Sequence, residues 1–431
     1  MEKGIKTYIG LSKIGVDTKV KLHVFFFITG LLFKGEVPLS KYVRVLRRLL
    51  FFRSKLKHNK YVKIGKDIKM NLYVPAFPSR AFFNACKKMI VFDEKMPCLT
   101  VLISVTSACK YGCSHCYQKL DKGKDADIET IVTVAKKLQD MGVAFFNIEG
   151  GEPFLVYDRL LTLCKSIDNR SEIMINTTGD GVTLERLQEL KSLGNVTGLM
   201  FSLHSPTPEG INAFTATPKA WDNMVNAIHI AHKAGVGVTF NSCLQREAFY
   251  DGTFEMIMDL AKGFDASLIQ LIKPKPAGGW LEGGAKTFEE SDVKQLRDKV
   301  NSYNLKSKYR KYPFVYSQLL EEEVDMFGCT AGGTDRFYIN AKGDMQPCEF
   351  LNISFGNIHT DNFDEIYTNM RKVFETPGDC KLCEQKSEDI LKLFRAENCD
   401  SLPLNKELSK LIYTNWKSGD KPDFYEKTDN L

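Results

Sequence analysis

The stretch TVLISVTSACKYGCSHCY, residues 100–117, joins an apolar run to three closely spaced cysteines. Residues 100–106 are mostly apolar or β-branched, which is typical of a strand that is buried on both faces. Cys109, Cys113 and Cys116 follow within eight positions, in the segment that leaves this strand. The order predicts a buried strand that presents three thiols at its C-terminal end.

Downstream of this stretch, strand-like apolar runs alternate with helical patterns. The further strands are expected at 143–148, 172–176, 198–203, 237–242 and 267–272. The helical patterns start at Asp127 and then cover 155–168, 184–193, 219–234 and 252–263. Such alternation predicts parallel βαβ units with right-handed crossovers. A doubly wound sheet and a partial barrel both fit six strands, and in either fold ligands gather at the C-terminal ends of the strands.

Three thiolates in one short loop suit a single iron–sulfur cluster. A cubane cluster has four irons, so three cysteines leave one iron open to a substrate or cofactor, as in a catalytic metal site. The alternative is a zinc ion whose fourth ligand is His115 or a distant residue. Because His115 directly precedes Cys116, the two are awkwardly placed to bind one ion. The spacing therefore favours a cluster.

With its surroundings, this motif resembles the radical SAM superfamily. CKYGCSHCY, 109–117, fits that family's Cys-x3-Cys-x-aromatic-Cys motif, with His115 in the aromatic position. EGGEP, 149–153, follows one βα unit later and is similar to the family's Gly-Gly-Glu-Pro motif, whose backbone meets the amino group of S-adenosylmethionine (SAM). Two glycines also let a backbone approach a ligand closely, and Pro153 fixes the turn. The resemblance covers roughly residues 98–300 and implies an α/β fold, a partial (β/α)6 TIM barrel of the radical SAM type.

The resemblance also implies cofactors and the residues that bind them. Cys109, Cys113 and Cys116 would hold a catalytic [4Fe–4S] cluster. The implied SAM-binding residues are Gly150, Gly151, Glu152, Pro153, Thr178, Ser202 and Asn241. The implied reaction is reductive cleavage of SAM, after which the 5′-deoxyadenosyl radical takes a hydrogen atom from an unactivated carbon. The electron would come from a reducing partner such as a flavodoxin or ferredoxin, while the protein positions the reactants and shields the radical.

A second group of cysteines follows the predicted barrel and resembles the SPASM/Twitch extension of radical SAM enzymes. A strand is expected at 337–340, with Gly343 in a hairpin turn. Only Cys399 follows where the full SPASM pattern has more cysteines, so the resemblance implies one auxiliary [4Fe–4S] cluster. Its implied ligands are Cys329, Cys348, Cys380 and Cys383. A four-thiol zinc site is the alternative.

The N-terminal segment differs in charge from the rest of the chain. Residues 1–70 hold 17 Lys or Arg against 4 Asp or Glu, whereas the whole chain has a net charge of +6. VFFFITGLLF, 24–33, is apolar but shorter than a membrane-spanning helix. Residues 39–57 read as a helix, with one apolar face made of Leu39, Tyr42, Val43, Leu46, Leu49 and Leu50. Two interpretations stay open: a helix that packs on the body, and a helix that lies on an anionic membrane surface.

These observations predict a division into four regions: a basic N-terminal extension (1–95), a radical SAM core (96–305), an auxiliary cluster domain (320–400) and a C-terminal tail (401–431). The grouping of the 12 cysteines favours metal binding in a reducing compartment, so a cytoplasmic enzyme is expected, with a peripheral position at the inner face of the membrane if the arm binds lipid. A small-molecule or lipid substrate is favoured over a peptide, which is the alternative. A non-catalytic iron–sulfur electron carrier is the third hypothesis, and no nucleic-acid partner is expected.

Overall fold

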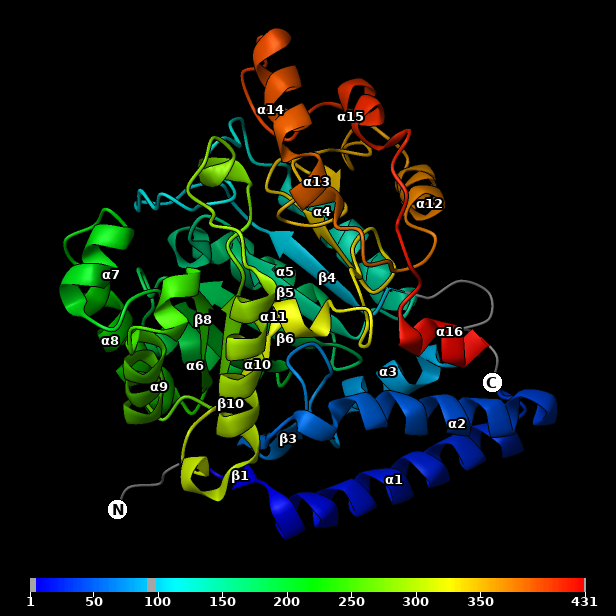
Figure 1. The fold of residues 1–431 in the computed structure, drawn as a ribbon. Helices are drawn as coiled ribbons and strands as arrows, with labels where there is room; N and C mark the ends of the chain where they lie inside the picture. The colour runs from blue at the N-terminus through cyan, green and yellow to red at the C-terminus, as the bar shows by residue number, and fades with distance from the viewer. Residues whose placement is uncertain (1–4, 91–97, 430–431) are drawn as a thin grey trace.

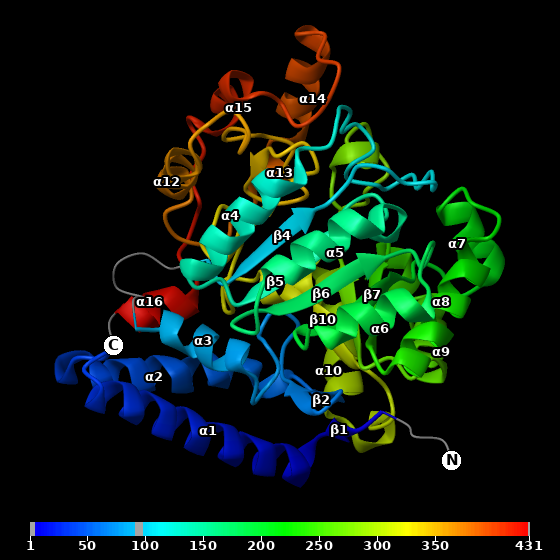
Figure 2. The ribbon, with the colours of Figure 1, turned by 180° about the vertical axis from the view of Figure 1, so that it is seen from behind.

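The computed structural model describes residues 5–90 and 98–429, and the expected boundary at 95–96 lies outside them. A curved sheet with helices on its outer face forms the body (Figures 1 and 2). The N-terminal helices lie at one end of this body, and most of the C-terminal segment lies at the opposite end (Figure 1). Both terminal segments therefore pack on the barrel from different sides.

Within the described residues, nine strands form the central sheet, in the order β10-β9-β8-β7-β6-β5-β4-β11-β12. The six expected strands are confirmed as β4 (Thr100–Ser104), β5 (Phe145–Glu149), β6 (Glu172–Thr177), β7 (Val196–Ser202), β8 (Gly237–Cys243) and β9 (Leu268–Ile272). All neighbouring pairs from β4 to β9 are parallel. Helices cover the outer face and side chains fill the inner one, which explains why the strands are mostly apolar. The fold is a partial barrel.

The helices that connect the strands pack on the outer face of the sheet (Figure 2). They are α4 (Ile128–Asp140), α5 (Tyr157–Ser166), α6 (Leu184–Ser192), α7 (Pro208–Phe214), α8 (Ala220–Ala234) and α9 (Thr253–Gly263). Thr183 caps α6 by accepting a hydrogen bond from the backbone N–H of Arg186, and Gly235 ends α8 in the left-handed region at φ +67°. The expected helices are confirmed, and α7 is an addition to them.

The sheet extends past the six expected strands at both edges. Helix α10 (Glu290–Leu305) leads to β10 (Phe314–Ser317), which pairs in parallel with β9. At the other edge β11 (Arg336–Ile339) pairs in parallel with β4 and returns as β12 (Met345–Gln346). Gly343 takes φ +90° in the connecting turn, which confirms the expected hairpin. The segment that carries the second cysteine group thus shares one sheet with the barrel.

A small antiparallel sheet closes the N-terminal end of the barrel. It contains β1 (Thr7–Tyr8), β2 (Tyr61–Ile64) and β3 (Asp67–Lys69). Val62 and Leu72 pack in one buried cluster with Phe145 and Leu268, the first residues of β5 and β9. Lys69 and Glu172 form a fully buried ion pair of 2.5 Å at the same end.

The basic N-terminal segment folds into a helical hairpin, α1 (Gly10–Phe33) and α2 (Leu39–Lys55), beside α3 (Arg80–Lys88). The expected helix at 39–57 is confirmed, and the rest of the chain covers its apolar face only in part. Val45 and Arg48 are the buried residues of α2, whereas Leu39, Val43 and Leu50 are exposed. The reason is that α2 packs with an edge of its apolar face, and the buried Arg48 donates from Nε to the backbone oxygen of Thr428 (3.3 Å).

The C-terminal segment is helical and irregular, with short elements that wrap around the barrel. These are α11 (Gln318–Glu321), α12 (Phe363–Val373), α13 (Leu382–Gln385), α14 (Ser387–Ala396), α15 (Lys406–Tyr413) and α16 (Asp423–Asp429). Phe424 of α16 stacks on Phe51 of α2, with ring centroids 5.7 Å apart. Helix α16 therefore packs back onto the N-terminal hairpin, whereas α15 lies beside α14 at the other end of the body (Figure 1). Across the residues that the structure covers, no helix has both the length and the apolar character needed to cross a bilayer.

Candidate active site

The cysteine loop leaves the C-terminal end of β4 and is closed at its base by two charged side chains. The Asp125 carboxylate accepts from Thr106 Oγ1 (2.6 Å) and from the backbone N–H of Ser107 (2.9 Å). Arg159 donates to the backbone oxygens of Val105 (3.0 Å) and Ala126 (2.7 Å). These bonds span the loop from both ends, so the thiols between them are held on a fixed frame.

A cavity of about 450 Å³ lies at the C-terminal ends of the barrel strands and gathers most of the predicted site residues. Its wall contains Cys109, Cys113, Cys116, Gly150, Gly151, Thr178, Ser202 and Asn241. These residues come from five separate βα connections and strand ends. Parallel strands bring such positions together because all of their C-terminal ends meet at one mouth.

The two glycines of EGGEP serve a contact inside the protein. A Cβ on Gly151 would lie 2.2 Å from the backbone oxygen of Ala108, and one on Gly150 would lie 2.5 Å from that of Thr106. The backbone N–H of Gly151 donates to the oxygen of Thr106 (2.8 Å). The glycines therefore allow the EGGEP loop to touch the start of the cysteine loop. Their backbone also lines the cavity, as expected.

Glu152 and Pro153 lie outside the wall of this cavity. The buried Glu152 carboxylate accepts hydrogen bonds from Thr177 Oγ1 (2.8 Å), from Thr178 Oγ1 (2.6 Å) and from the backbone N–H groups of Thr178 (2.7 Å) and Phe154 (3.1 Å). These four donors, all from the protein, satisfy the hydrogen-bonding capacity of the Glu152 carboxylate. Glu152 thus ties the EGGEP loop to the end of β6, and its place in the site is that of a positioning residue.

His115 occupies the aromatic position of the cysteine motif as a packed ring. Its centroid lies 4.5 Å from that of Phe214, 4.7 Å from His204 and 5.7 Å from Trp280. Burial lowers the pKa of His115 to about 4, so the ring is neutral at physiological pH. Its buried Nδ1 has no hydrogen-bond partner among the described residues.

Several polar residues of the cavity wall were not among the predicted cofactor-binding residues, although Glu149 begins the EGGEP motif. Asn147, Glu149, Asn176, Gln270, Lys273 and Lys275 all line the cavity. Burial, with the nearby Glu349, raises the pKa of Glu149 to about 8. The signal was available, since Asn147 and Glu149 alternate with apolar residues of β5, and polar residues at alternate positions near the end of a buried strand face the barrel interior.

The residues of the cavity fit a cluster and a polar ligand. Buried oxygens of Asn176, Asn241 and Glu149 have no hydrogen-bond partner within the described part of the chain, and such atoms usually have one in proteins. Burial raises the pKa of Cys113 to about 12 and that of Cys116 to about 11, with neighbouring thiols adding to the effect. Iron binding must therefore displace protons from these thiols. Within the described residues, no three His, Cys, Asp or Glu side chains converge on a single metal ion.

The second cysteine group is only partly assembled. Cys329, Cys348 and Cys383 line a small cavity, whereas Cys380 lies outside its wall. A Cβ on Gly419 would lie 2.8 Å from the sulfur of Cys380, which places this thiol against the C-terminal segment. Cys399 is also absent from the wall of this cavity.

The walls of this small cavity and of the larger one share two residues. Lys275 and Phe350 line both cavities. The buried Lys275 pairs with Glu384 (2.7 Å) and lies 3.6 Å from Glu322, which in turn pairs with Arg336 (2.7 Å). Because Glu384 follows Cys383 directly, this ion pair fixes the second cysteine group against the wall of the main cavity.

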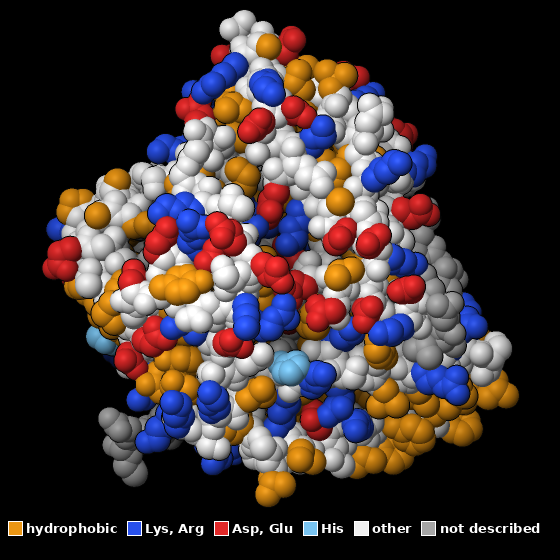
Figure 3. Space-filling view, viewed as in Figure 1, with side chains coloured by type: hydrophobic (Ala, Val, Ile, Leu, Met, Phe, Trp, Pro, Cys, Tyr) orange, Lys and Arg blue, Asp and Glu red, His pale blue; other side chains and the backbone are white. Residues whose placement is uncertain are grey.

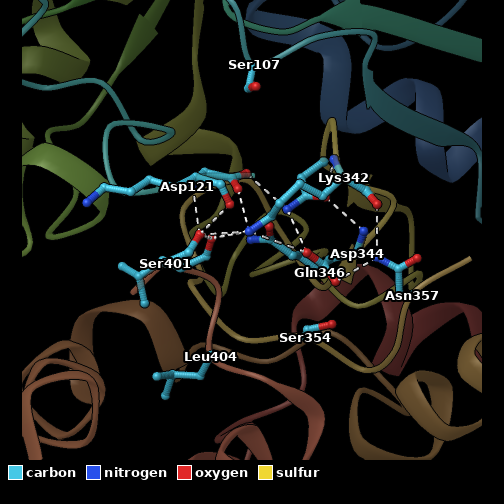
Figure 4. A network of polar contacts seen from close by, with 12 residues as sticks. Ser107, Asp121, Lys342, Asp344, Gln346, Ser354, Asn357, Ser401 and Leu404 are labelled. Atoms are coloured by element: carbon cyan, nitrogen blue, oxygen red, sulfur yellow. Dashed lines mark hydrogen bonds and ion pairs between the residues drawn. The ribbon is translucent and has the colours of Figure 1, made fainter. Parts of the chain in front are cut away.

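A polar network also ties the cysteine loop to the C-terminal segment (Figure 4). Lys342, in the β11–β12 turn, lies 2.7 Å from Asp121 and donates to Ser401 Oγ (2.9 Å). Asn340 donates to the other carboxylate oxygen of Asp121 (3.0 Å). The hairpin of the second cysteine segment therefore supports the loop that carries the first three thiols.

A partial barrel with three thiols and a glycine turn at the C-terminal ends of its strands defines a barrel enzyme built around a metal cofactor. Comparison with known proteins gives the family. Residues 103–261 match the Radical SAM superfamily, and residues 329–385 match SPASM, described as an iron-sulfur cluster-binding domain. The chain is a radical SAM enzyme with a C-terminal SPASM domain. The cofactors of this class are a [4Fe–4S] cluster and SAM at the barrel, and iron–sulfur in the SPASM domain.

The similar proteins act on different substrates. An AdoMet-dependent heme synthase of Nitratidesulfovibrio vulgaris is 22% identical over 68% of this chain and 86% of its own length. The PqqA peptide cyclase of Gluconobacter oxydans is 22% identical over 68% of this chain and 84% of its own. The crystal structure of Streptococcus suis SuiB bound to the precursor peptide SuiA has the same fold, with a TM-score of 0.52, 14% identity and coverage of 68% and 74%.

Proposed function

We propose that the enzyme carries out a net oxidation or C–H functionalisation of a small-molecule or lipid substrate. When bound, the cluster and SAM supply a one-electron cleavage of the sulfur–C5′ bond and a 5′-deoxyadenosyl radical that takes a hydrogen atom from an unactivated carbon. The observation that carries this proposal is the cavity of about 450 Å³, whose wall holds the three motif thiols, Gly150 and Gly151 together. Cys109, Cys113 and Cys116 are the proposed ligands of the catalytic cluster.

The remaining wall residues support particular roles. Thr178, Ser202 and Asn241 offer hydrogen-bonding groups to SAM, and the unpartnered oxygen of Asn241 has the geometry of a free acceptor. Asn147, Gln270 and Lys273 also line the cavity and favour a substrate that presents polar groups. The cavity volume lies within the roughly 300–1,000 Å³ range of small-ligand sites.

The second cysteine group is proposed to hold one auxiliary [4Fe–4S] cluster that accepts the electron left on the substrate. Removal of one hydrogen atom leaves an unpaired electron, and a two-electron oxidation requires an acceptor for it. The support is the shared wall, because Lys275 and Phe350 line both cavities. Cys380, whose thiol lies near Gly419, is the proposed fourth ligand.

A maturase that modifies a ribosomally made peptide is the second candidate. The likeness to SuiB and to the PqqA peptide cyclase favours it, since both names refer to peptide substrates. The heme synthases favour the small-molecule alternative. We also propose that the enzyme lies in the cytoplasm at an anionic membrane surface through its basic N-terminal hairpin, and that a flavodoxin or ferredoxin reduces it.

The test begins with anaerobically reconstituted protein, dithionite and SAM. The expected products are methionine and 5′-deoxyadenosine, and the joint change of Cys109, Cys113 and Cys116 to Ala should abolish them and remove about four irons per chain. Cys399→Ala is the matched control and should keep both. If the triple variant cleaves SAM at the normal rate, the assignment of the catalytic cluster is wrong.

The electron-acceptor role is tested with Cys380→Ala combined with Cys383→Ala. This variant should still cleave SAM but give no oxidised product when it is incubated with cell extract and the metabolites are compared. A normal yield of product would contradict the acceptor role, and an insoluble protein would indicate that the cluster is structural.

A further inference from the structure

The α1–α2 hairpin carries a stripe of large apolar side chains that is left uncovered by the rest of the described chain. On α1 it consists of Leu11, Ile14, Leu22, Phe25, Phe26 and Phe33. At 3.6 residues per turn these six lie within about one third of the helix circumference. Leu11 and Phe33, near its two ends, are 87% and 86% exposed. Leu39, Val43 and Leu50 of α2 are exposed as well.

Figure 3 shows the hydrophobic side chains gathered at lower right, over the end of α1 and the start of α2. Exposed apolar surface of this extent marks a contact with a partner or a membrane.

The stripe is flanked by cations. Lys19 and Lys21 of α1 are exposed and fall on opposite sides of the stripe, and Arg47 of α2 is exposed too. The two acidic residues on α1 and its following turn are engaged within the protein: Asp17 pairs with Arg53, and Glu36 pairs with Lys87 (2.9 Å). An apolar face bordered by lysine and arginine complements a surface of anionic lipid headgroups.

An apolar cavity of about 300 Å³ lies directly under this hairpin, between α1, α2 and α3. Its walls include Val24, Leu46 and Leu49 from the hairpin, and Phe82 and Cys86 from α3. It has about twice the volume of the roughly 150 Å³ apolar cavities that stay dry and take up benzene. A hydrocarbon is therefore the chemistry that this cavity accepts.

The position of the cavity fixes which end of a ligand enters it. Leu22, Phe25 and Leu50 belong both to the exposed stripe and to the cavity wall, so the cavity opens on the stripe. Lys21 and Arg53 are the charged members of this wall. At the inner end, Phe52 and Met89 also line a smaller cavity whose wall includes the charged Lys88 and Asp335. A hydrocarbon chain must therefore end before those charges.

We propose that the hairpin lies on an anionic membrane and that the cavity takes one acyl chain of an anionic phospholipid, with its phosphate near Lys21. This inference rests on the membrane association proposed above, and it specifies the lipid that the hairpin binds. The apolar stripe would enter the headgroup region, Lys19 and Arg47 would face headgroups, and the barrel mouth would stay away from the bilayer, because the hairpin lies at the other end of the strands (Figure 1).

The experiment uses the full-length reconstituted protein and vesicles of palmitoyl-oleoyl phosphatidylglycerol or phosphatidylcholine. The protein should float with the phosphatidylglycerol vesicles, and binding should fall as salt rises because the attraction is screened. Protein re-isolated from these vesicles should carry about one phosphatidylglycerol per chain. Phe26→Ser with Phe33→Ser should weaken vesicle binding by at least ~10-fold, since neither side chain lines the cavity and both would enter the lipid.

Two further variants separate the surface from the cavity. Ala85→Phe fills the cavity from α3 and should abolish the bound lipid while the protein still floats. Leu411→Ser, a 66% exposed leucine on α15, is the matched control and should change neither readout. SAM cleavage should be normal in all variants. The lipid measurements therefore test this proposal separately from the proposed reaction, which the SAM-cleavage assay tests. Equal binding to both lipids, protein that carries no lipid, or a stripe variant that only converts a dimer to a monomer would overturn the proposal.

Discussion

Replacing His115 with phenylalanine tests whether this residue is a packing element or a metal ligand. The imidazole contacts three aromatic rings with centroids at 4.5–5.7 Å, and its buried Nδ1 has no partner among the described residues. A phenyl ring keeps the ring contacts and removes an unpaired buried nitrogen, whose desolvation costs about 1 kcal/mol or more. His115→Phe should therefore leave the free energy of unfolding unchanged or raise it by about 1 kcal/mol. Iron content and SAM cleavage should stay within about twofold of normal, a difference below ~0.5 kcal/mol.

The companion variant His115→Ala removes the ring and leaves a hole between Phe214 and Trp280. Loss of a partly buried ring and its aromatic contacts should cost about 2–3 kcal/mol. Thermal unfolding of the anaerobic protein measures this cost, and iron analysis with a 5′-deoxyadenosine assay measures the site. If His115→Phe loses its metal while Cys399→Ala keeps it, His115 is a ligand and the interpretation of the motif as an all-cysteine site is refuted.

Three further predictions concern Gly151, Glu321 and Glu172. Gly151→Ala should lose iron binding or fold poorly, because its Cβ would lie 2.2 Å from the oxygen of Ala108; a normal iron content by chemical analysis would contradict the tight contact of the two loops. Burial raises the pKa of Glu321 to about 8, so the folded state keeps a proton that the unfolded state loses above pH ~4.5. The stability contributed by this proton should therefore decline from pH ~4.5 to ~8. Relative to that of the native protein, the free energy of unfolding of Glu321→Gln should rise over this range by up to about 5 kcal/mol, as denaturant titrations at several pH values would measure. If the free energies of unfolding of the two proteins change with pH in the same way, this prediction is wrong. Glu172→Gln should cost about 3–5 kcal/mol in the same titrations, because it leaves Lys69 buried without a charged partner; a cost below ~1 kcal/mol would show that the pair is dispensable.

Much of the barrel and half of the site followed from local sequence. The six strands from residue 100 to 272 are buried on both faces, so each reads as a mostly apolar run, and the caps at Thr183 and Gly235 use local backbone geometry. Because parallel strands present all C-terminal ends at one mouth, the order of motifs along the chain was sufficient to bring Cys109, Gly150 and Asn241 to one cavity. Motif spacing also placed Cys329, Cys348 and Cys383 around a common space.

Only the tertiary structure decided the contacts that join distant segments. The sequence does not indicate that Thr177 and Thr178 donate hydrogen bonds to Glu152. Nor does it indicate that Lys275 lines two cavities or that the Cys380 thiol lies near Gly419. Which part of the apolar face of α2 packs on the body was likewise not given by its sequence. Helical periodicity shows which residues share a face, but the buried part of that face depends on the elements that pack against it. On α2 the contacts with α1 and α16 leave Leu39, Val43 and Leu50 exposed to solvent. Burial is a property of the whole fold, because it is set by surfaces that meet across hundreds of residues.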